Sequence, residues 1–370
     1  MKAVIVNCFD TYGDRVELLR KTLVEKGFSV EVFTSDYKHI EKIYINELRE
    51  GYRYFHAQPY TKNLSMERLK SHQMLSREVF SYLDKNGNDI DLLWVLLPPN
   101  TFAKDAAEIK RKHKNIKLIF DLIDLWPETM PIPVVKNLWP ITVWGKIRDD
   151  NLNTADYIVT ECDLYQKVLN LKQYGVPFAT LYLAKEKSTQ EIRSPQDDGR
   201  LSLCYLGSIN NIIDIDAICS IIRQAEKKYP VDLHIIGDGE KREELISRTK
   251  LSSARVFYHG KIYDEKGKQD IFNQCHYGLN IMKKSVCVGL TMKSLDYLSG
   301  GLPIINNIKG DTWDSVEKYS IGINYPEEII LKDNEKIRRR VSIYFDTFLS
   351  RFAFEKSVSQ IIEGLGNLHI

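Results

Sequence analysis

The segment from residue 289 to residue 303 carries a lysine and an acid at a spacing that suits phosphate binding. Thr291 is a good N-cap for a short helix, and Lys293 and Asp296 would then lie three residues apart on one face of it. A lysine in the first helical turn lies beside the positive end of the helix dipole, which is unfavourable unless an anion binds there. The pattern therefore predicts a phosphate site at Lys293. The alternative is a solvent-facing lysine in a weak ion pair with Asp296.

Glycines at defined places support the same prediction. Gly300 is expected to supply the left-handed residue that ends the helix, and Pro303 to begin the next strand. An earlier Gly237-Asp238-Gly239 follows an apolar run. Because a residue without a Cβ lets backbone N–H groups approach a pyrophosphate closely, these glycines suit a nucleotide diphosphate. A lone Gly-Asp-Gly also makes an ordinary turn, so this motif is weak by itself.

Apolar runs of strand length alternate with helical patterns along both halves of the chain, which is typical of parallel sheets with crossover helices. A length of 370 residues suggests two domains. The best linker is residues 184–200, where the apolar period is lost and charged and turn-forming residues concentrate. We therefore predict two Rossmann-like, doubly wound α/β domains facing a cleft, with residues 1–185 in the first and 200–349 in the second. Residues 350–370 can complete the first domain.

The expected strands of the first half are Ala3–Cys8, Phe28–Phe33, Asp91–Leu97, Lys117–Asp121, Tyr157–Thr160 and Thr180–Leu183. Those of the second half are Leu201–Gly207, Asp232–Gly237, Ala254–Tyr258, Gly278–Ile281 and Pro303–Ile305. The clearest helix runs from Asp14 to Lys26, and helical sequence closes the chain from about Glu327 to Leu365. Open parallel sheets bind ligands at the carboxyl ends of their strands, so the cleft between the domains is the expected active site.

Composition excludes several classes of protein. The net charge is +2, from 52 basic and 50 acidic residues, which argues against a general nucleic-acid binder. The start of the chain does not read as a signal peptide, and no apolar run approaches the ~18 residues of a membrane span. The six cysteines are scattered singly, which predicts reduced core residues in a cytoplasmic protein.

Four segments of the second half, taken in order, resemble the donor-binding domain of GT-B glycosyltransferases. The likeness is greatest to family 4 enzymes of capsule, O-antigen and exopolysaccharide assembly. The segments are Tyr205–Ser208, Leu233–Leu245, Phe257–Ile262 and Gly289–Pro303. In the last, which resembles G-x-x-x-K-x-x-E-Y-x-x-x-G-x-P, the resemblance implies that Lys293 meets phosphate and Asp296 meets the ribose hydroxyls. The full donor-binding set that it implies is Gly13, Arg15, Gly207, Ser208, Gly237, Asp238, Gly239, Lys261, Ile262, Thr291, Lys293 and Asp296.

The sequence departs from the family pattern at three positions. Ser208 stands where the family usually has arginine, and Asp214 stands about where it has lysine. Lys293 would then have to neutralise more of the phosphate charge. Val288 takes the place of the first acid of the paired-glutamate motif, which puts a direct carboxylate contact to the donor sugar in doubt.

In the first half, Asp124-Leu125-Trp126-Pro127-Glu128 resembles the D-x-W-P-E segment of polysaccharide transferases in this family. A carboxylate just after a strand can orient or deprotonate an acceptor hydroxyl, so Asp124 is the predicted catalytic residue. The alternative is that Asp124 caps the next segment, with Asp121 and Glu128 as other candidates. The loop that carries Gly13 and Arg15 follows the first strand, where the fold commonly lets it approach the donor phosphates. Arg15 is otherwise an exposed helix residue.

Two further patterns bear on metal and membrane binding. The triplets Asp89-Ile90-Asp91 and Asp214-Ile215-Asp216 formally match a D-x-D metal motif, but the first opens a strand and the second begins a helix, so no metal is predicted. Three tryptophans (Trp126, Trp139, Trp144) and three cations (Lys136, Lys146, Arg148) lie between residues 126 and 148. They can rest on a membrane surface or pack in a core.

These observations predict a metal-independent hexosyltransferase that needs no cofactor. Its donor would be a UDP-sugar, its acceptor a saccharide or a lipid-diphosphate-linked oligosaccharide of surface polysaccharide biosynthesis, and the resemblance implies retention of configuration. The predicted location is the cytoplasm, at the inner face of the cell membrane. Two alternatives are a UDP-sugar epimerase, which shares the architecture, and a non-catalytic glycosyltransferase-like subunit, which the missing acid at Val288 keeps open.

Overall fold

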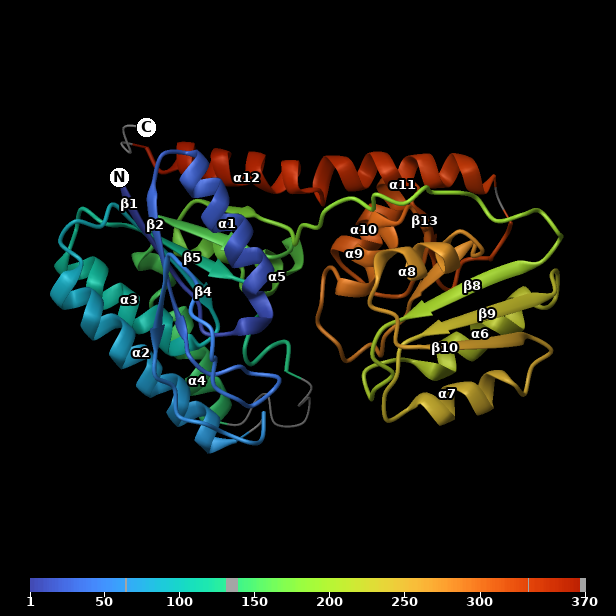
Figure 1. Cartoon of the computed structure of the whole chain (residues 1–370), viewed down its shortest axis with the longest axis horizontal. Helices are drawn as coiled ribbons and strands as arrows, with labels where there is room; N and C mark the ends of the chain where they lie inside the picture. The colour runs from blue at the N-terminus through green and yellow to red at the C-terminus, as the bar shows by residue number, and fades with distance from the viewer. Residues whose placement is uncertain (64, 131–138, 332, 367–370) are drawn as a thin grey trace. The chain divides into compact units, whose positions relative to one another are not determined.

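The computed structural model describes residues 1–63, 65–130, 139–331 and 333–366. The chain divides into two compact units. The first comprises Met1–Tyr182 together with the chain from Phe354 onward, and the second comprises Leu183–Ala353. Each unit is built around one open parallel sheet with crossover helices (Figure 1), as the alternating sequence pattern predicts.

The strands of the first sheet lie in the order β3-β2-β1-β4-β5-β6-β7. Their bounds are β1 Lys2–Val6, β2 Ser29–Ser35, β3 Tyr52–Phe55, β4 Leu92–Leu97, β5 Lys117–Leu122, β6 Tyr157–Thr160 and β7 Phe178–Thr180. All neighbours are parallel, and β4 is buried along its whole length, as a central parallel strand with helices on both faces should be. The order reverses between β1 and β4, so the loops after these strands border the point where open α/β sheets bind ligands.

The helices of the first unit are α1 Gly13–Glu25, α2 Met66–Asn86, α3 Asn100–Lys112, α4 Trp139–Asp149, α5 Asp163–Val168 and α12 Arg351–Gly364. Because crossovers are right-handed and the strand order runs outward in both directions from β1, α1 and α3 cover opposite faces of the sheet. Helices α2, α3 and α4 pack beside one another. From Phe354 onward, α12 belongs to this unit, where the Arg15 guanidinium lies 5.6 Å from the Phe354 ring centroid.

The second sheet has the strand order β10-β9-β8-β11-β12-β13. Its strands are β8 Leu201–Leu206, β9 Val231–Ile236, β10 Arg255–Gly260, β11 Tyr277–Asn280, β12 Ile304–Asn306 and β13 Gly322–Asn324. Its helices are α6 Ile215–Ala225, α7 Arg242–Thr249, α8 Glu265–Phe272, α9 Met292–Ser299, α10 Asp311–Tyr319 and α11 Asn334–Phe348. The order reverses between β8 and β11, which sets the turn after β8 and the start of α9 at the ligand-binding edge of this sheet.

Several sequence-based boundaries were wrong. The short strands β3 and β13 were missed, since four and three residues give too little alternation to detect. The strand expected at Thr180–Leu183 is β7, which ends at Thr180. The closing helical region begins at Asn334 rather than Glu327, because residues 327–331 form a bend and irregular chain.

Candidate functional site

Glycine-bearing turns follow β8 and β9 at one edge of the second sheet. Gly207, Gly237 and Gly239 have φ values of 115°, 136° and 157°, a region that favours glycine. A Cβ on Gly237 would lie 2.0 Å from the Gly207 carbonyl oxygen, and one on Gly239 would lie 2.3 Å from the Ile209 carbonyl oxygen. The Ile209 N–H donates to the Asp238 carbonyl at 2.9 Å. Contact between the two turns therefore requires glycine at 237 and 239 even without a ligand.

Gly207 differs from the other two glycines because the space beside its Cα is open. The nearest atom to a Cβ built there is Lys293 Cε, at 4.0 Å. The next residue, Ser208, is exposed, and its backbone N–H has no acceptor among the described residues. Its carbonyl accepts from Tyr205 Oη at 2.8 Å, which fixes the turn. The Gly207–Ser208 turn therefore leaves an N–H donor and open space near the Lys293 side chain.

Helix α9 begins with a capping box. Thr291 Oγ1 accepts from the Ser294 N–H, and Ser294 Oγ accepts from the Thr291 N–H, both at 3.1 Å. Thr291 Oγ1 also donates to Asn280 Oδ1 at 2.8 Å, which anchors the helix start to the end of β11. The predicted cap at Thr291 is confirmed. Since the cap uses only one N–H of the first turn, the N–H groups of Met292 and Lys293 have no partner within the helix.

The predicted left-handed residue at the end of α9 was assigned to the wrong glycine. Gly300 has φ −84°, whereas Gly301 has φ 68°. The helical twist continues through Gly300, so the chain reverses one residue later. Glycine is still needed at 300, because a Cβ there would lie 2.7 Å from the Phe272 ring.

Lys293 is a half-buried lysine in the first turn of α9. Its Nζ lies 3.5 Å from Tyr205 Oη and 4.7 Å from the centroid of that ring. Burial lowers the pKa of Lys293 to about 8. Among the described residues, no carboxylate lies within 4 Å of Nζ. The solvent-facing alternative for this lysine is therefore wrong.

Asp296 does not pair with Lys293. Its carboxylate accepts from Lys185 Nζ, and Lys268 Nζ lies 3.9 Å from the same Oδ1 atom. Lys185, Lys268 and Asp296 line a small cavity together with Ser188, Glu265 and Gly300. The predicted ribose contact stays a prediction, and it requires the Lys185 ammonium to share or leave the carboxylate. Sequence reasoning missed both lysines, because they lie far from Asp296 in the chain.

Tyr297, in the same segment, ties α9 to β8. Its Oη accepts from the Leu206 N–H at 2.6 Å and donates to the Cys204 carbonyl at 3.0 Å. The absence of a side chain at Gly278 makes room for the ring, since a Cβ there would lie 2.6 Å from it. One turn before Tyr297 is Lys293, so this contact positions the lysine beside the turn after β8. The tyrosine of the G-x-x-x-K-x-x-E-Y-x-x-x-G-x-P pattern could have indicated this role.

Three other predicted donor residues lie at the same edge of the sheet. Asp238 Oδ1 accepts from the Gly239 N–H at 2.8 Å and from Arg242 at 3.3 Å, so this carboxylate shapes its own turn. Lys261 is exposed and Ile262 is half-buried in the loop after β10.

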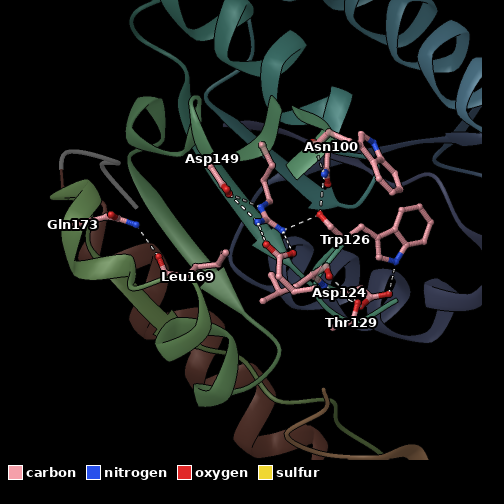
Figure 2. A network of polar contacts seen from close by, with 11 residues as sticks. Asn100, Asp124, Trp126, Thr129, Asp149, Leu169 and Gln173 are labelled. Atoms are coloured by element: carbon pink, nitrogen blue, oxygen red, sulfur yellow. Dashed lines mark hydrogen bonds and ion pairs between the residues drawn. The ribbon is translucent and has the colours of Figure 1, made fainter. Parts of the chain in front are cut away.

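In the first unit, the Asp124 carboxylate is held by its own loop (Figure 2). It accepts from the Leu125 N–H at 2.9 Å, Trp126 Nε1 at 2.8 Å and Thr129 Oγ1 at 2.5 Å. Burial raises the pKa of Asp124, and these hydrogen bonds oppose that rise. The capping alternative therefore describes what Asp124 does in this structure. Its role toward an acceptor stays a prediction.

Arg148, which is fully buried, organises the rest of the D-x-W-P-E segment. Its guanidinium contacts both oxygens of Glu128, at 2.8 and 3.0 Å, and donates to the Trp126 carbonyl at 3.1 Å. Asp149 adds a second carboxylate at 2.8 Å. Glu128 is therefore a structural partner of Arg148, and this network fixes the loop that carries Asp124.

The structure places Arg15 in a buried ion pair. Its Nη2 and Nε contact the two oxygens of Asp121 at 2.8 and 3.2 Å, and its Nη1 donates to the Leu181 carbonyl at 2.9 Å. Trp94 Nε1 also donates to Asp121, at 3.0 Å. The exposed-surface alternative for Arg15 is wrong. Because Arg15 is only 5% exposed and each of its three nitrogens already donates to a protein oxygen, the geometry also argues against the predicted phosphate contact.

Gly13, the other predicted residue of that loop, begins α1 with φ −54°, and nothing lies within 4 Å of a Cβ built on it. This backbone does not require glycine.

The two tryptophans of this stretch whose side chains are described, Trp126 and Trp144, pack against the core of the first unit. The Trp126 ring is buried between those of Phe9, His72 and Trp144, with centroid distances of 5.5, 6.0 and 5.6 Å. Trp144 packs against the same core cluster. Lys136 lies outside the described residues, as does the Trp139 side chain. Within the described chain, no helix is both long and apolar enough to cross a membrane.

Neither Asp-Ile-Asp triplet gathers further ligands. Asp89 pairs with Lys2 at 3.1 Å, and Asp91 accepts from the Lys2 N–H at 2.7 Å. Asp214 caps α6 by accepting from the Ala217 N–H at 2.9 Å, as expected for a helix start, and Asp216 pairs with Arg248. Across the described ranges, no cluster of three or more acids, histidines and cysteines could hold a metal ion.

Comparisons with known proteins show the fold. No protein-family model matches the sequence, and no curated protein matches it either. HepE of Anabaena, solved with UDP and glucose, matches with a TM-score of 0.63 at 12% identity, covering 98% of this chain and 99% of that one. The lipopolysaccharide outer core galactosyltransferase WaaB, in its apo form, matches with a TM-score of 0.58 at 12% identity, over 97% and 95% of the two chains.

The catalytic domain of starch synthase IV from Arabidopsis thaliana, bound to ADP and acarbose, gives a TM-score of 0.60 at 12% identity, with 98% of each chain covered. At these identities the likeness establishes architecture alone. The chain has the GT-B fold of two Rossmann-like α/β domains.

Proposed function

We propose that this protein is a glycosyltransferase that transfers a sugar from a nucleotide diphosphate donor held by its second unit. The observation that carries the proposal is Lys293, a half-buried lysine without a carboxylate partner among the described residues, at the start of a capped helix and beside the open Gly207 turn. The GT-B fold supports the proposal, and so do neighbours whose structures hold UDP or ADP.

The charge of Lys293 favours a phosphate ligand. A pKa lowered from 10.5 to about 8 means that the folded protein holds this ammonium at a cost of about 1–3 kcal/mol relative to water, once partial exposure of the side chain is taken into account. A phosphate oxygen offsets that cost through a charge-assisted hydrogen bond. The N–H groups of Met292, Lys293 and Ser208 can add hydrogen bonds, since they lack protein partners at the helix start and in the adjoining turn.

We propose UDP as the nucleotide. One neighbour was solved with UDP and another is named a galactosyltransferase, and both support this choice. Asp296 supports it too, because its carboxylate suits a ribose diol. For Asp296 to bind the diol, the Lys185 contact must open or be shared. Donor binding is therefore expected to disturb the residues 183–188 that precede β8.

The same groups can stabilise the leaving diphosphate during transfer. Negative charge grows on the phosphate oxygen as the glycosidic bond breaks, and preorganised N–H groups and an ammonium stabilise it without reorganising solvent. We propose that transfer needs no divalent ion, because the Asp-Ile-Asp carboxylates serve lysine, arginine and helix-cap contacts. Retention of configuration belongs to the same proposal and rests on the family resemblance alone.

We assign the acceptor to the first unit, with Asp124 on its binding loop, and propose a saccharide or lipid-diphosphate-linked oligosaccharide of surface polysaccharide biosynthesis. The corresponding location is the inner face of the cell membrane. With Trp126 and Arg148 buried and Trp144 packed against the core, the exposed Val143 and Lys146 are the remaining described candidates for membrane contact. Flotation with acidic liposomes should fall in the Val143→Ser/Lys146→Gln variant, and unchanged flotation would remove α4 from this role.

Donor binding is tested by measuring thermal stability with UDP-, GDP-, ADP- and dTDP-sugars. A nucleotide at a hundred times its dissociation constant stabilises by roughly 2.7 kcal/mol, and we expect this only for the UDP series. Release of UDP from the stabilising sugar, with water or added saccharide as acceptor, separates a transferase from a non-catalytic subunit. Interconversion of free UDP-sugars without acceptor would instead identify an epimerase.

A further inference from the structure

Two cations of the first unit share one aromatic ring. Arg68, in the first turn of α2, is only 6% exposed, and its Cζ lies 5.8 Å from the Tyr60 ring centroid. Lys42 Nζ lies 4.3 Å from the same centroid. The guanidinium also lies over Trp126, at 4.3 Å, and Phe9, at 5.3 Å. Both charges are therefore held against aromatic surfaces, where they are only partly hydrated.

A single residue joins the two cations. The Asn63 carbonyl accepts from Arg68 Nη1, and Asn63 Oδ1 accepts from Lys42 Nζ, each at 2.6 Å. In the described chain, no carboxylate lies within 4 Å of either cationic group. Burial, and then the charge of Arg68, lowers the pKa of Lys42. The Asp10 carboxylate offsets this effect only in part, since burial and the charge of Arg68 are the larger causes.

Nearby carboxylates are engaged elsewhere. Asp10 Oδ1 accepts from the His39 N–H at 2.7 Å, and Asp124 accepts hydrogen bonds from its own loop. Lys42 itself has φ 60°, a left-handed conformation that is uncommon for a residue with a side chain. Such conformations concentrate at functional sites, because the surrounding structure must enforce them.

Unsatisfied polar atoms gather at the same place. Arg68 Nε is buried without a hydrogen-bond partner, and so are both ring nitrogens of His72, one turn further along α2. His72 is 3% exposed, and its ring stacks on Trp126. Burying a polar group without a hydrogen bond is unfavourable, so several such groups at one position indicate a site that a ligand completes.

The position of the cluster in the fold suits a ligand. The segments that carry Phe9, Lys42, Tyr60 and Trp126 follow β1, β2, β3 and β5, and the carboxyl ends of parallel strands meet at one edge. Trp126 connects the cluster to Asp124, since its indole donates to that carboxylate. The two cations therefore lie at the edge of the sheet that carries the predicted acceptor loop.

We propose that Arg68 and Lys42 form a binding subsite for an oxyanion of the acceptor, a phosphate or a sugar carboxylate. The guanidinium and the ammonium each supply a positive charge, so one anion neutralises both. Identifying the anion as part of the acceptor rests on the proposed function, whereas the subsite itself does not.

Calorimetry with pyrophosphate, phosphate and glucuronate tests the subsite at constant ionic strength. The titrations use the full chain carrying Lys293→Met, so that the proposed donor site cannot bind the anion. We expect at least one of the three anions to bind, and Lys42→Gln to weaken it roughly ten- to a hundred-fold. Tighter binding of pyrophosphate than of glucuronate would indicate a phosphorylated acceptor, and tighter binding of glucuronate would indicate an acidic sugar.

Matched variants separate the subsite from general charge effects. Lys70→Gln removes an exposed charge from the same helix and should change affinity less than two-fold. Arg68→Lys keeps the charge but loses the planar fork, and should also weaken binding. No binding of any anion, or equal binding in the Lys42→Gln and Lys70→Gln proteins, overturns the subsite even if UDP binds to the unmodified chain. Anion binding without UDP binding would support the subsite and refute the donor proposal.

Discussion

Replacing Lys293 by methionine should stabilise the unliganded protein while weakening the binding of UDP. Methionine keeps most of the apolar stem beside Tyr205 and removes only the ammonium. If the lysine is present to bind phosphate, its charge destabilises the free protein and stabilises the complex. A solvent-exposed lysine without a binding role would show neither effect.

The magnitude follows from the burial of the charge. The shift of the Lys293 pKa from 10.5 to about 8 corresponds to about 3 kcal/mol at neutral pH, and partial exposure of the side chain reduces this. We therefore expect Lys293→Met to raise the free energy of unfolding by about 1–3 kcal/mol. Loss of the charge-assisted contact to phosphate should lower UDP affinity roughly ten- to a hundred-fold.

Urea denaturation of the unliganded proteins at pH 7 measures the first effect, and calorimetry with UDP and uridine measures the second. Uridine affinity should barely change, since uridine has no phosphate. Lys266→Met, at an exposed position of α8, is the matched control and should alter stability by no more than about 0.5 kcal/mol. A Lys293→Met protein that is less stable than the original, or that binds uridine and UDP equally weakly, would refute the phosphate assignment.

The remaining predictions concern pH and the buried carboxylates. UDP affinity should be constant between about pH 7 and pH 8 and fall up to ten-fold per pH unit above that, because the free site then loses the proton that the complex keeps. A Lys293→Met protein with the same decline would contradict this. The unfolded chain binds that proton up to about pH 10.5, so between these pH values the Lys293 contribution to stability should rise with pH, as urea titrations would show. Arg15→Gln should cost about 3–5 kcal/mol by leaving Asp121 buried and unpaired, with UDP affinity of the folded protein unchanged; a loss of affinity would return Arg15 to the donor site. Asp124→Asn should lower stability by about 1–3 kcal/mol and impair transfer without changing UDP affinity, and an unaltered transfer rate would remove Asp124 from the acceptor site.

Local sequence pattern determined most of the architecture. Alternation of apolar runs with helical periods predicted parallel α/β domains, because burial on both faces of a central strand leaves a continuous apolar run such as Leu92–Leu97. The cap at Thr291 could be predicted for a similar reason, since its hydrogen bonds to Ser294 join residues three apart. Gly207, Gly237 and Lys293 were selected by motif, and the structure brings the turns and the lysine together at one edge of the second sheet.

Only the tertiary structure decided which charged groups are paired. Asp296 pairs with Lys185, 111 residues away, rather than with Lys293 three residues away, and Arg15 pairs with Asp121 across 106 residues. Periodicity reports which face of an element is buried, but it carries no information about the partner that another strand or loop brings to that face. The electrostatic free energy depends on that partner and on the water excluded around it. For this reason the sequence could suggest Lys293 and Arg15 equally. In the described part of the chain, the fold gives Arg15 a buried carboxylate and places none within 4 Å of the Lys293 ammonium.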